Sequence, residues 1–150
     1  MITVRGEIVY PMDNEYLQNS NIINDLAAGS LKTHGAREAT GVDSLAEGSN
    51  TISSGNSAHA EGSFTTASGN SAHAEGGGTT AKGGAAHAEG SSTTASGNSA
   101  HAEGSRTAAN GHHSHAEGYL TMAIGDSSHV EGYETTASGL HSHAEGIGYM

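Results

Sequence analysis

Small and polar residues alternate along most of the chain in a pattern that returns every fourteen residues. The segment His-Ala-Glu-Gly begins at His59 and recurs at this interval as far as His143, with one variant, His-Val-Glu-Gly, at His129. The interval is kept without a slip over seven repeats, from residue 48 to residue 145. Regular self-similarity of this kind predicts a solenoid, in which each repeat adds one coil to a stack.

Each repeat divides into two halves that both read Ala-x-Gly-x-x-small-x. We interpret each half as one short strand followed by a turn, because side chains along a strand point alternately to its two faces. In a representative repeat, the positions expected to point inward are Ala72, Ala74, Thr79 and Ala81. Those expected to point outward are His73, Glu75, Thr80 and Lys82.

The predicted fold is therefore all-β: a parallel β-roll, or solenoid, of about eight 14-residue coils over residues 34–150, with a small non-repeating cap in residues 1–33. The first coil is a weaker repeat, in which Leu45 takes the place of the histidine. The glycine of each half falls where a strand ends, as expected if the turn needs positive φ or a close backbone approach. Alanine, serine and threonine fill the core columns, so the two strands of a coil must lie closer than the ~10 Å usual for packed sheets, with coils stacked at about 4.8 Å.

The first 33 residues do not repeat. Ile2, Val4, Ile8 and Tyr10 predict one or two short strands that end at Pro11. Ser20 precedes the segment 21–26, and Gly29 follows it closely, which predicts a short capped helix there. Because a solenoid needs a cap on its first coil, this segment is expected to cover the roll, and it could also dock onto another protein of the same particle.

The repeat Ala-x-Gly-x-x-Ser-x-Ala-x-Gly resembles the head repeats of YadA-like trimeric autotransporter adhesins and related repeats in phage fibres, over residues 34–146. The resemblance implies a left-handed parallel β-roll and three rolls side by side about a threefold axis, that is, a homotrimer. Family repeats place Val and Ile toward the trimer interface, whereas this chain has His and Glu in those positions. We therefore expect a polar ladder between chains, made of His59, His73, His87, His101, His115, His129, His143, Glu61, Glu75, Glu89, Glu103, Glu117, Glu131 and Glu145.

Composition limits the classes of protein to which the chain can belong. Only 18 of its 150 residues are Leu, Ile, Val or Phe, too few for an ordinary core, so a single roll is expected to be marginal and to pack with other chains. The net charge of −11 would repel a phosphate backbone or an anionic membrane, so neither nucleic acid nor membrane insertion is expected. Without cysteine there is neither a disulfide nor a cysteine nucleophile, and we find neither a signal peptide nor 18 consecutive apolar residues.

Eleven histidines raise the question of metal binding, since imidazole is a good ligand for zinc, nickel and copper. Repeated His-x-Glu could supply a nitrogen and an oxygen together, but paired polar groups of this kind are usually structural, so we predict no metal and no cofactor. If histidine and glutamate meet between chains, the pKa of the histidine would be raised, and we predict that melting of the trimer depends on pH between about 5 and 8. His112, His113 and His141 fall in turns. The zincin motif, phosphate loops and nucleophile elbows are missing, so the chain is not expected to be an enzyme.

The last coils are more apolar than the earlier ones. The candidate contact surface consists of Tyr119, Leu120, Met122, Ile124 and Tyr133. Apolar side chains on an otherwise polar fibre are typical of a contact patch, although they could equally be larger turns that pack on neighbouring chains.

These expectations combine into one functional hypothesis. The chain would be a structural protein of a phage or phage-like particle, located in the virion, anchored to another virion protein by residues 1–33 and presenting its last coils to a host-surface receptor. The first alternative is the head fragment of a trimeric adhesin on a bacterial cell surface. The second is a histidine-rich roll that binds metal.

Overall fold

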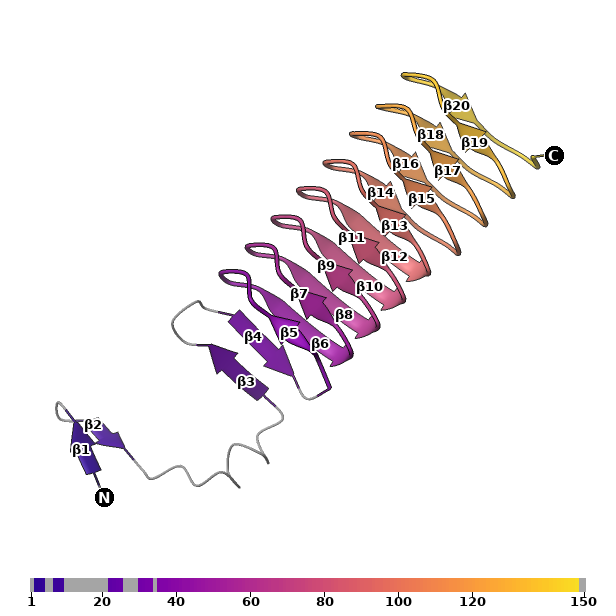
Figure 1. The fold of residues 1–150 in the computed structure, drawn as a ribbon. Helices are drawn as coiled ribbons and strands as arrows, with labels where there is room; N and C mark the ends of the chain where they lie inside the picture. Colours follow the sequence, from indigo (N-terminus) through magenta and orange to yellow (C-terminus); the bar gives the residue numbers. More distant parts are fainter. Residues whose placement is uncertain (1, 5–6, 10–21, 26–29, 34, 149–150) are drawn as a thin grey trace.

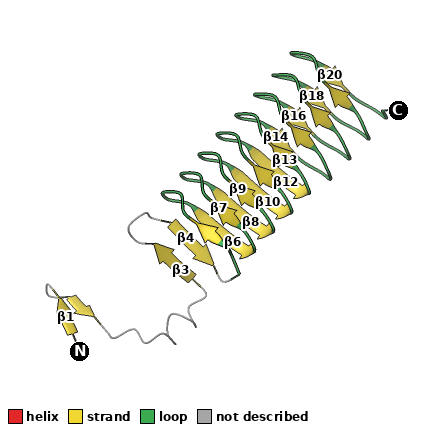
Figure 2. Cartoon of the chain, in the orientation of Figure 1, coloured by secondary structure: helices red, strands yellow, loops and turns green. Residues whose placement is uncertain are grey.

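The computed structural model describes residues 2–4, 7–9, 22–25, 30–33 and 35–148. Its strands form a long stack of similar coils, and none of the described residues is helical (Figures 1 and 2). The predicted all-β parallel solenoid of about eight coils is therefore confirmed.

Each coil contributes one strand to each of two parallel sheets. The eight-stranded sheet consists of β5 (Glu38–Ala39), β7 (Ile52–Ser53), β9 (Thr66–Ala67), β11 (Thr80–Ala81), β13 (Thr94–Ala95), β15 (Ala108–Ala109), β17 (Met122–Ala123) and β19 (Thr136–Ala137). The repeat strands of the ten-stranded sheet are β6 (Leu45–Ser49), β8 (His59–Ser63), β10 (His73–Gly77), β12 (His87–Ser91), β14 (His101–Ala102), β16 (His115–Ala116), β18 (His129–Val130) and β20 (His143–Ala144).

Every strand pairs with the equivalent strand one repeat away. His73 of β10 lies beside His59 of β8 on one side and His87 of β12 on the other. The backbone N–H of His73 donates to the carbonyl of Ala86 at 2.9 Å, and similar bonds join the other coils. Parallel pairing in this register stacks identical positions into straight columns along the roll (Figure 1).

The strands before the roll differ in part from the prediction. β1 (Ile2–Val4) and β2 (Glu7–Val9) pair antiparallel, which confirms two short strands here; Tyr10 and Pro11 lie outside the described residues. The predicted capped helix is wrong, because Ile22–Asp25 is the strand β3. It pairs antiparallel with β4 (Ser30–Thr33), and β-branched Ile22 and Ile23 favour a strand over a helix.

β4 also connects this segment to the roll. It pairs parallel with β6, with Leu31 opposite Leu45, so β4 continues the 14-residue register by one step beyond the first coil. The hairpin of β3 and β4 thus covers the edge of β6, the strand of the first coil, as a cap on a solenoid has to do.

The interior is a thin column of small side chains. Ala72, Ala74, Thr79 and Ala81 are all buried as predicted, and the largest fully buried side chain among the described residues is that of Val130. The glycines allow successive coils to stack closely. Gly76 has φ of 103°, and a Cβ on Gly69 would overlap the carbonyl oxygen of Gly83 in the next coil.

Candidate functional site

The outer face of the ten-stranded sheet carries the column of seven histidines predicted from the sequence. Neighbouring rings stack with centroids 4.8–4.9 Å apart, and their planes differ by between 2° and 20°. This spacing is the distance between coils, because each histidine occupies the same place on its strand. The column comprises His59, His73, His87, His101, His115, His129 and His143.

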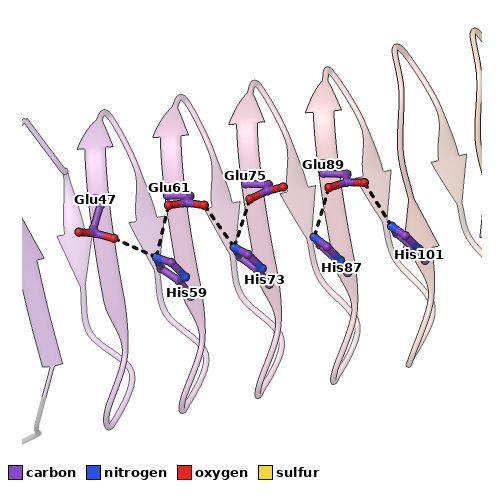
Figure 3. A network of polar contacts seen from close by, with 8 residues as sticks. All are labelled: Glu47, His59, Glu61, His73, Glu75, His87, Glu89 and His101. Atoms are coloured by element: carbon purple, nitrogen blue, oxygen red, sulfur yellow. Dashed lines mark hydrogen bonds and ion pairs between the residues drawn. The ribbon is translucent and has the colours of Figure 1, made fainter.

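A column of glutamates runs beside the histidines, two residues further along each strand (Figure 3). The two oxygens of Glu61 reach toward different histidines: Oε2 lies 4.0 Å from Nε2 of His59 and Oε1 lies 3.8 Å from Nε2 of His73. The carboxylate of Glu89 is shared in the same way, at 3.9 Å from His87 and 3.8 Å from His101. These two carboxylates, and that of Glu103, therefore lie between the imidazoles of two successive coils.

Most of these contacts are too long for hydrogen bonds. Nε2 of His73, His87, His101, His115 and His129 is buried and has no hydrogen-bond partner among the described residues. The carboxylate oxygens nearest to these nitrogens lie 3.7–4.0 Å away, within the range of an ion pair but beyond that of a hydrogen bond. The imidazole nitrogens thus point at carboxylates that they do not directly bond.

Burial of the imidazoles changes their acidity. It lowers the pKa of His73, His101 and His115, and the positive charge of stacked neighbouring histidines lowers it further. Glutamates opposite the rings raise the pKa again, but by less. Within one chain the pKa of these three histidines is therefore lowered, because desolvation and repulsion within the stack outweigh the attraction of the carboxylates, and the rise expected from contacts between chains stays a prediction.

The glutamates alternate in acidity along the column. Hydrogen bonding between neighbouring carboxyls raises the pKa of Glu75 and of Glu103 to about 7, and it also raises the pKa of Glu131. The same interaction lowers the pKa of the intervening residues Glu89 and Glu117. A ladder of like charges at the coil spacing is thus relieved by protonating every second member.

An open groove follows the glutamate column. Its volume is about 660 Å³, and it is lined by Glu61, Gly62, Glu75, Gly76, Glu89, Gly90, Glu103, Gly104, Glu117 and Gly118. Because a glycine follows each glutamate, side chains do not cover the carboxylates from that side. The column is therefore accessible to small solutes.

Histidine and glutamate also gather in groups whose ligand atoms lie within 4.8 Å of one another. Four such groups contain one histidine between glutamates of its own and the preceding coil, for example Glu61, His73 and Glu75. The sequence spacing placed these residues in columns, and the structure adds that the five imidazoles from His59 to His115 each face two carboxylates within one chain. The expectation of His–Glu contacts between chains stays a prediction.

The three turn histidines lie away from these columns. Nδ1 of His112 accepts a hydrogen bond from the backbone N–H of Asn98 at 3.1 Å. In other coils Asn Oδ1 does the same, as Asn98 does for Gly84 at 2.9 Å. This turn ladder was not predicted, although the recurrence of Asn one position after the repeat glycine was its signal.

The candidate contact surface is divided between the two sheets. Tyr119 and Tyr133 continue the ten-stranded sheet as bridges and stack at 5.1 Å. Met122 begins β17 of the other sheet, and it and Ile124 are both exposed. Of the five predicted residues, the structure therefore brings Tyr119 and Tyr133 together, whereas Met122 lies on the other sheet. Leu140 and Ile147, at 72 % and 64 % exposed, are further apolar side chains on the last coils.

Comparison with known proteins does not assign the chain to a family. No protein-family model matches the chain, and no curated protein matches it. Within the described ranges, no helix has the length and apolar character needed to cross a bilayer. The resemblance to adhesin and phage-fibre repeats therefore remains a basis for proposals.

Proposed function

We propose that the chain is a non-enzymatic structural protein whose rolls associate side by side as a homotrimer. It would form a fibre or knob of a phage or phage-like particle. Residues 1–33 would bind another virion protein, and the last coils would contact a host-surface receptor. The location would be the virion.

The observation that carries this proposal is the regular outer face of the ten-stranded sheet. Its His and Glu columns repeat at 4.8–4.9 Å, so an identical chain alongside would offer the same spacing at every coil. The core holds only small side chains, and burying this face against other copies would add stability that a single roll lacks. Three chains, and the left-handed coil, are what the repeat resemblance implies.

Light scattering on the purified full chain tests the association. We expect about 45 kDa, three times the chain mass of 15.0 kDa. A folded species of 15.0 kDa would contradict the trimer and leave both columns in contact with solvent.

The particle assignment needs a separate test, because a trimeric adhesin head would give the same mass. Antibody against the chain should label phage particles in electron micrographs. Labelling of the bacterial surface in cells without particles would instead support the adhesin alternative.

A further inference from the structure

The buried histidine nitrogens and the carboxylates beside them form a repeated set of potential ligands. In each full group, one Nε2 and one oxygen from each of two glutamates lie within 4.8 Å of one another. The groups of this kind are Glu47, His59 and Glu61; Glu61, His73 and Glu75; Glu75, His87 and Glu89; and Glu89, His101 and Glu103. All three ligands come from one chain, so the inference does not rest on the proposed trimer.

The distances suit a small divalent cation. Zinc binds histidine nitrogen and carboxylate oxygen at about 2.0–2.2 Å, which places two ligand atoms in a tetrahedral site about 3.4 Å apart. Nε2 of His73 lies 3.8 Å from oxygens of both Glu61 and Glu75, and Nε2 of His59 lies 3.2 Å from an oxygen of Glu47. The nitrogen–oxygen distances therefore need to shorten by a few tenths of an ångström, and the two carboxylate oxygens, which lie within 4.8 Å of each other, would approach by rotation of their side chains.

The chemistry of the nitrogen supports the same conclusion. Nε2 of His73, His87 and His101 is buried without a hydrogen-bond partner among the described residues, and a buried polar atom left in this state is unfavourable. A cation between Nε2 and two carboxylates would satisfy all three groups. We propose that this column binds zinc ions, each held by one imidazole and two carboxylates, with the fourth position open to the groove along Glu61–Glu117.

The ligand set also selects among metals. One nitrogen and two oxygens suit zinc and neighbouring transition metals, whereas calcium and magnesium require six or more oxygen ligands. The four groups of potential ligands contain none of the turn histidines, and Nδ1 of His112 already accepts the backbone N–H of Asn98.

Sharing of the carboxylates limits how many ions one chain can hold. Ions in successive coils would be separated by about the coil spacing, 4.8–4.9 Å, and would compete for the glutamate between them. Ions in alternate coils would each have two carboxylates of their own, which neutralise the charge of a divalent cation. Eight glutamates, Glu47 to Glu145 at intervals of fourteen, therefore accommodate at most four ions. We expect occupation of either His59, His87, His115 and His143 or His73, His101 and His129.

Equilibrium dialysis of the full chain against zinc chloride, followed by elemental analysis, measures the stoichiometry. We expect three to four ions per chain, and cobalt in place of zinc should give the intense visible absorption of a tetrahedral site. Absence of bound zinc at micromolar free concentrations would overturn the proposal. Seven ions per chain would overturn occupation of alternate coils.

Variants locate the bound ions. Substitution of all seven column histidines by Leu, the residue that occupies this column at Leu45, should abolish zinc binding. As a matched control, H112N, H113S and H141S should retain it, because Asn98 and Ser99 show that Asn and Ser occupy these turn positions in another coil. Zinc binding that survives in the Leu variant or disappears in the control would overturn the proposal.

A second variant keeps the proposal testable if the sevenfold substitution prevents folding. E75Q/E89Q/E103Q preserves side-chain shape but removes three consecutive charged ligands. Two ions should then remain, because only the groups at the two ends of the column keep two carboxylates. An unchanged stoichiometry would show that these carboxylates are not ligands.

Discussion

Glu47 Oε2 lies 3.2 Å from Nε2 of His59, although twelve residues separate the two along the chain. It is the shortest contact between the two columns among the described residues. The coil of Glu47 carries Leu45 in the histidine column, so this carboxylate approaches one imidazole, whereas Glu61 lies between two, at 4.0 Å and 3.8 Å. Glu145 at the other end of the column lies 3.8 Å from His143, so a single imidazole partner does not by itself bring the two groups within hydrogen-bond distance.

The lowered pKa values of His73, His101 and His115 predict acid sensitivity in chelator-treated protein. Because the folded pKa lies below the unfolded value of ~6.5, the unfolded chain binds more protons, so stability is complete above that pH and falls as pH drops toward the folded pKa. Partly exposed groups of this kind contribute about 0.2–1 kcal/mol each. The groups that face His73 are His59, His87, Glu61, Glu75 and Glu89.

Histidine ring signals followed by NMR against pH provide the measurement. We expect midpoints below the value of the same histidines in denaturant. Midpoints above the denaturant value would contradict the prediction, and would indicate that carboxylates, including those of neighbouring chains, dominate over burial.

The raised pKa of Glu75 and Glu103, about 7, predicts the opposite pH response from the glutamate column. A carboxyl with a raised folded pKa favours folding below its unfolded value of ~4.3, and this contribution is lost as pH rises through 7. At pH 8, E75Q/E103Q should therefore have a free energy of unfolding about 0.2–1 kcal/mol greater than that of wild type. E89Q/E117Q, where the pKa is lowered, should be destabilised at the same pH. Urea unfolding at pH 8 measures both variants. An equal change in the free energy of unfolding would contradict the alternation of glutamate pKa along the column.

The buried threonine column predicts a stabilising substitution. Oγ1 of Thr93 is buried with no hydrogen-bond partner among the described residues, so Thr93→Val removes an unsatisfied hydroxyl and should stabilise by about 1 kcal/mol. Oγ1 of Thr135 donates to the carbonyl of Glu131 at 2.9 Å, so Thr135→Val should cost about 1 kcal/mol. Thermal unfolding of both variants tests this, and a loss of stability in Thr93→Val would show that its hydroxyl has a partner in solution.

The close approach of successive coils predicts a severe effect of one methyl group. A Cβ on Gly69 would overlap backbone atoms of Gly83, so Gly69→Ala should cost about 3 kcal/mol or more. Gly77→Ala is the control: nothing lies within 4 Å of its Cβ position, and serine occupies this position in neighbouring coils, so the change should stay within about 0.5 kcal/mol. Chemical denaturation compares the two. A mild Gly69→Ala would mean that the coils can move apart.

The sequence predicted the repeat and its faces because both depend on local rules. Ala74 is buried and His73 is half-exposed as expected, since strand alternation and the parallel register act in the same way at every coil. The prediction of a helix at Ile22–Asp25 is wrong. The residues before and after the segment resemble helix caps, whereas nothing in the sequence indicated that it pairs with β4. Tertiary pairing overrides local preference at such positions.

The chain by itself therefore determined the columns, the small-residue core and the turns, all of which follow from periodicity. Only the tertiary structure decided that a glutamate such as Glu61 divides its oxygens between the imidazoles of His59 and His73, which belong to two coils. It also decided the sign of the histidine pKa shifts, because burial and stacking at 4.8–4.9 Å outweigh the carboxylates. Distances between side chains on neighbouring coils depend on the spacing of the strands and on the conformation of each side chain, and the sequence alone specifies neither.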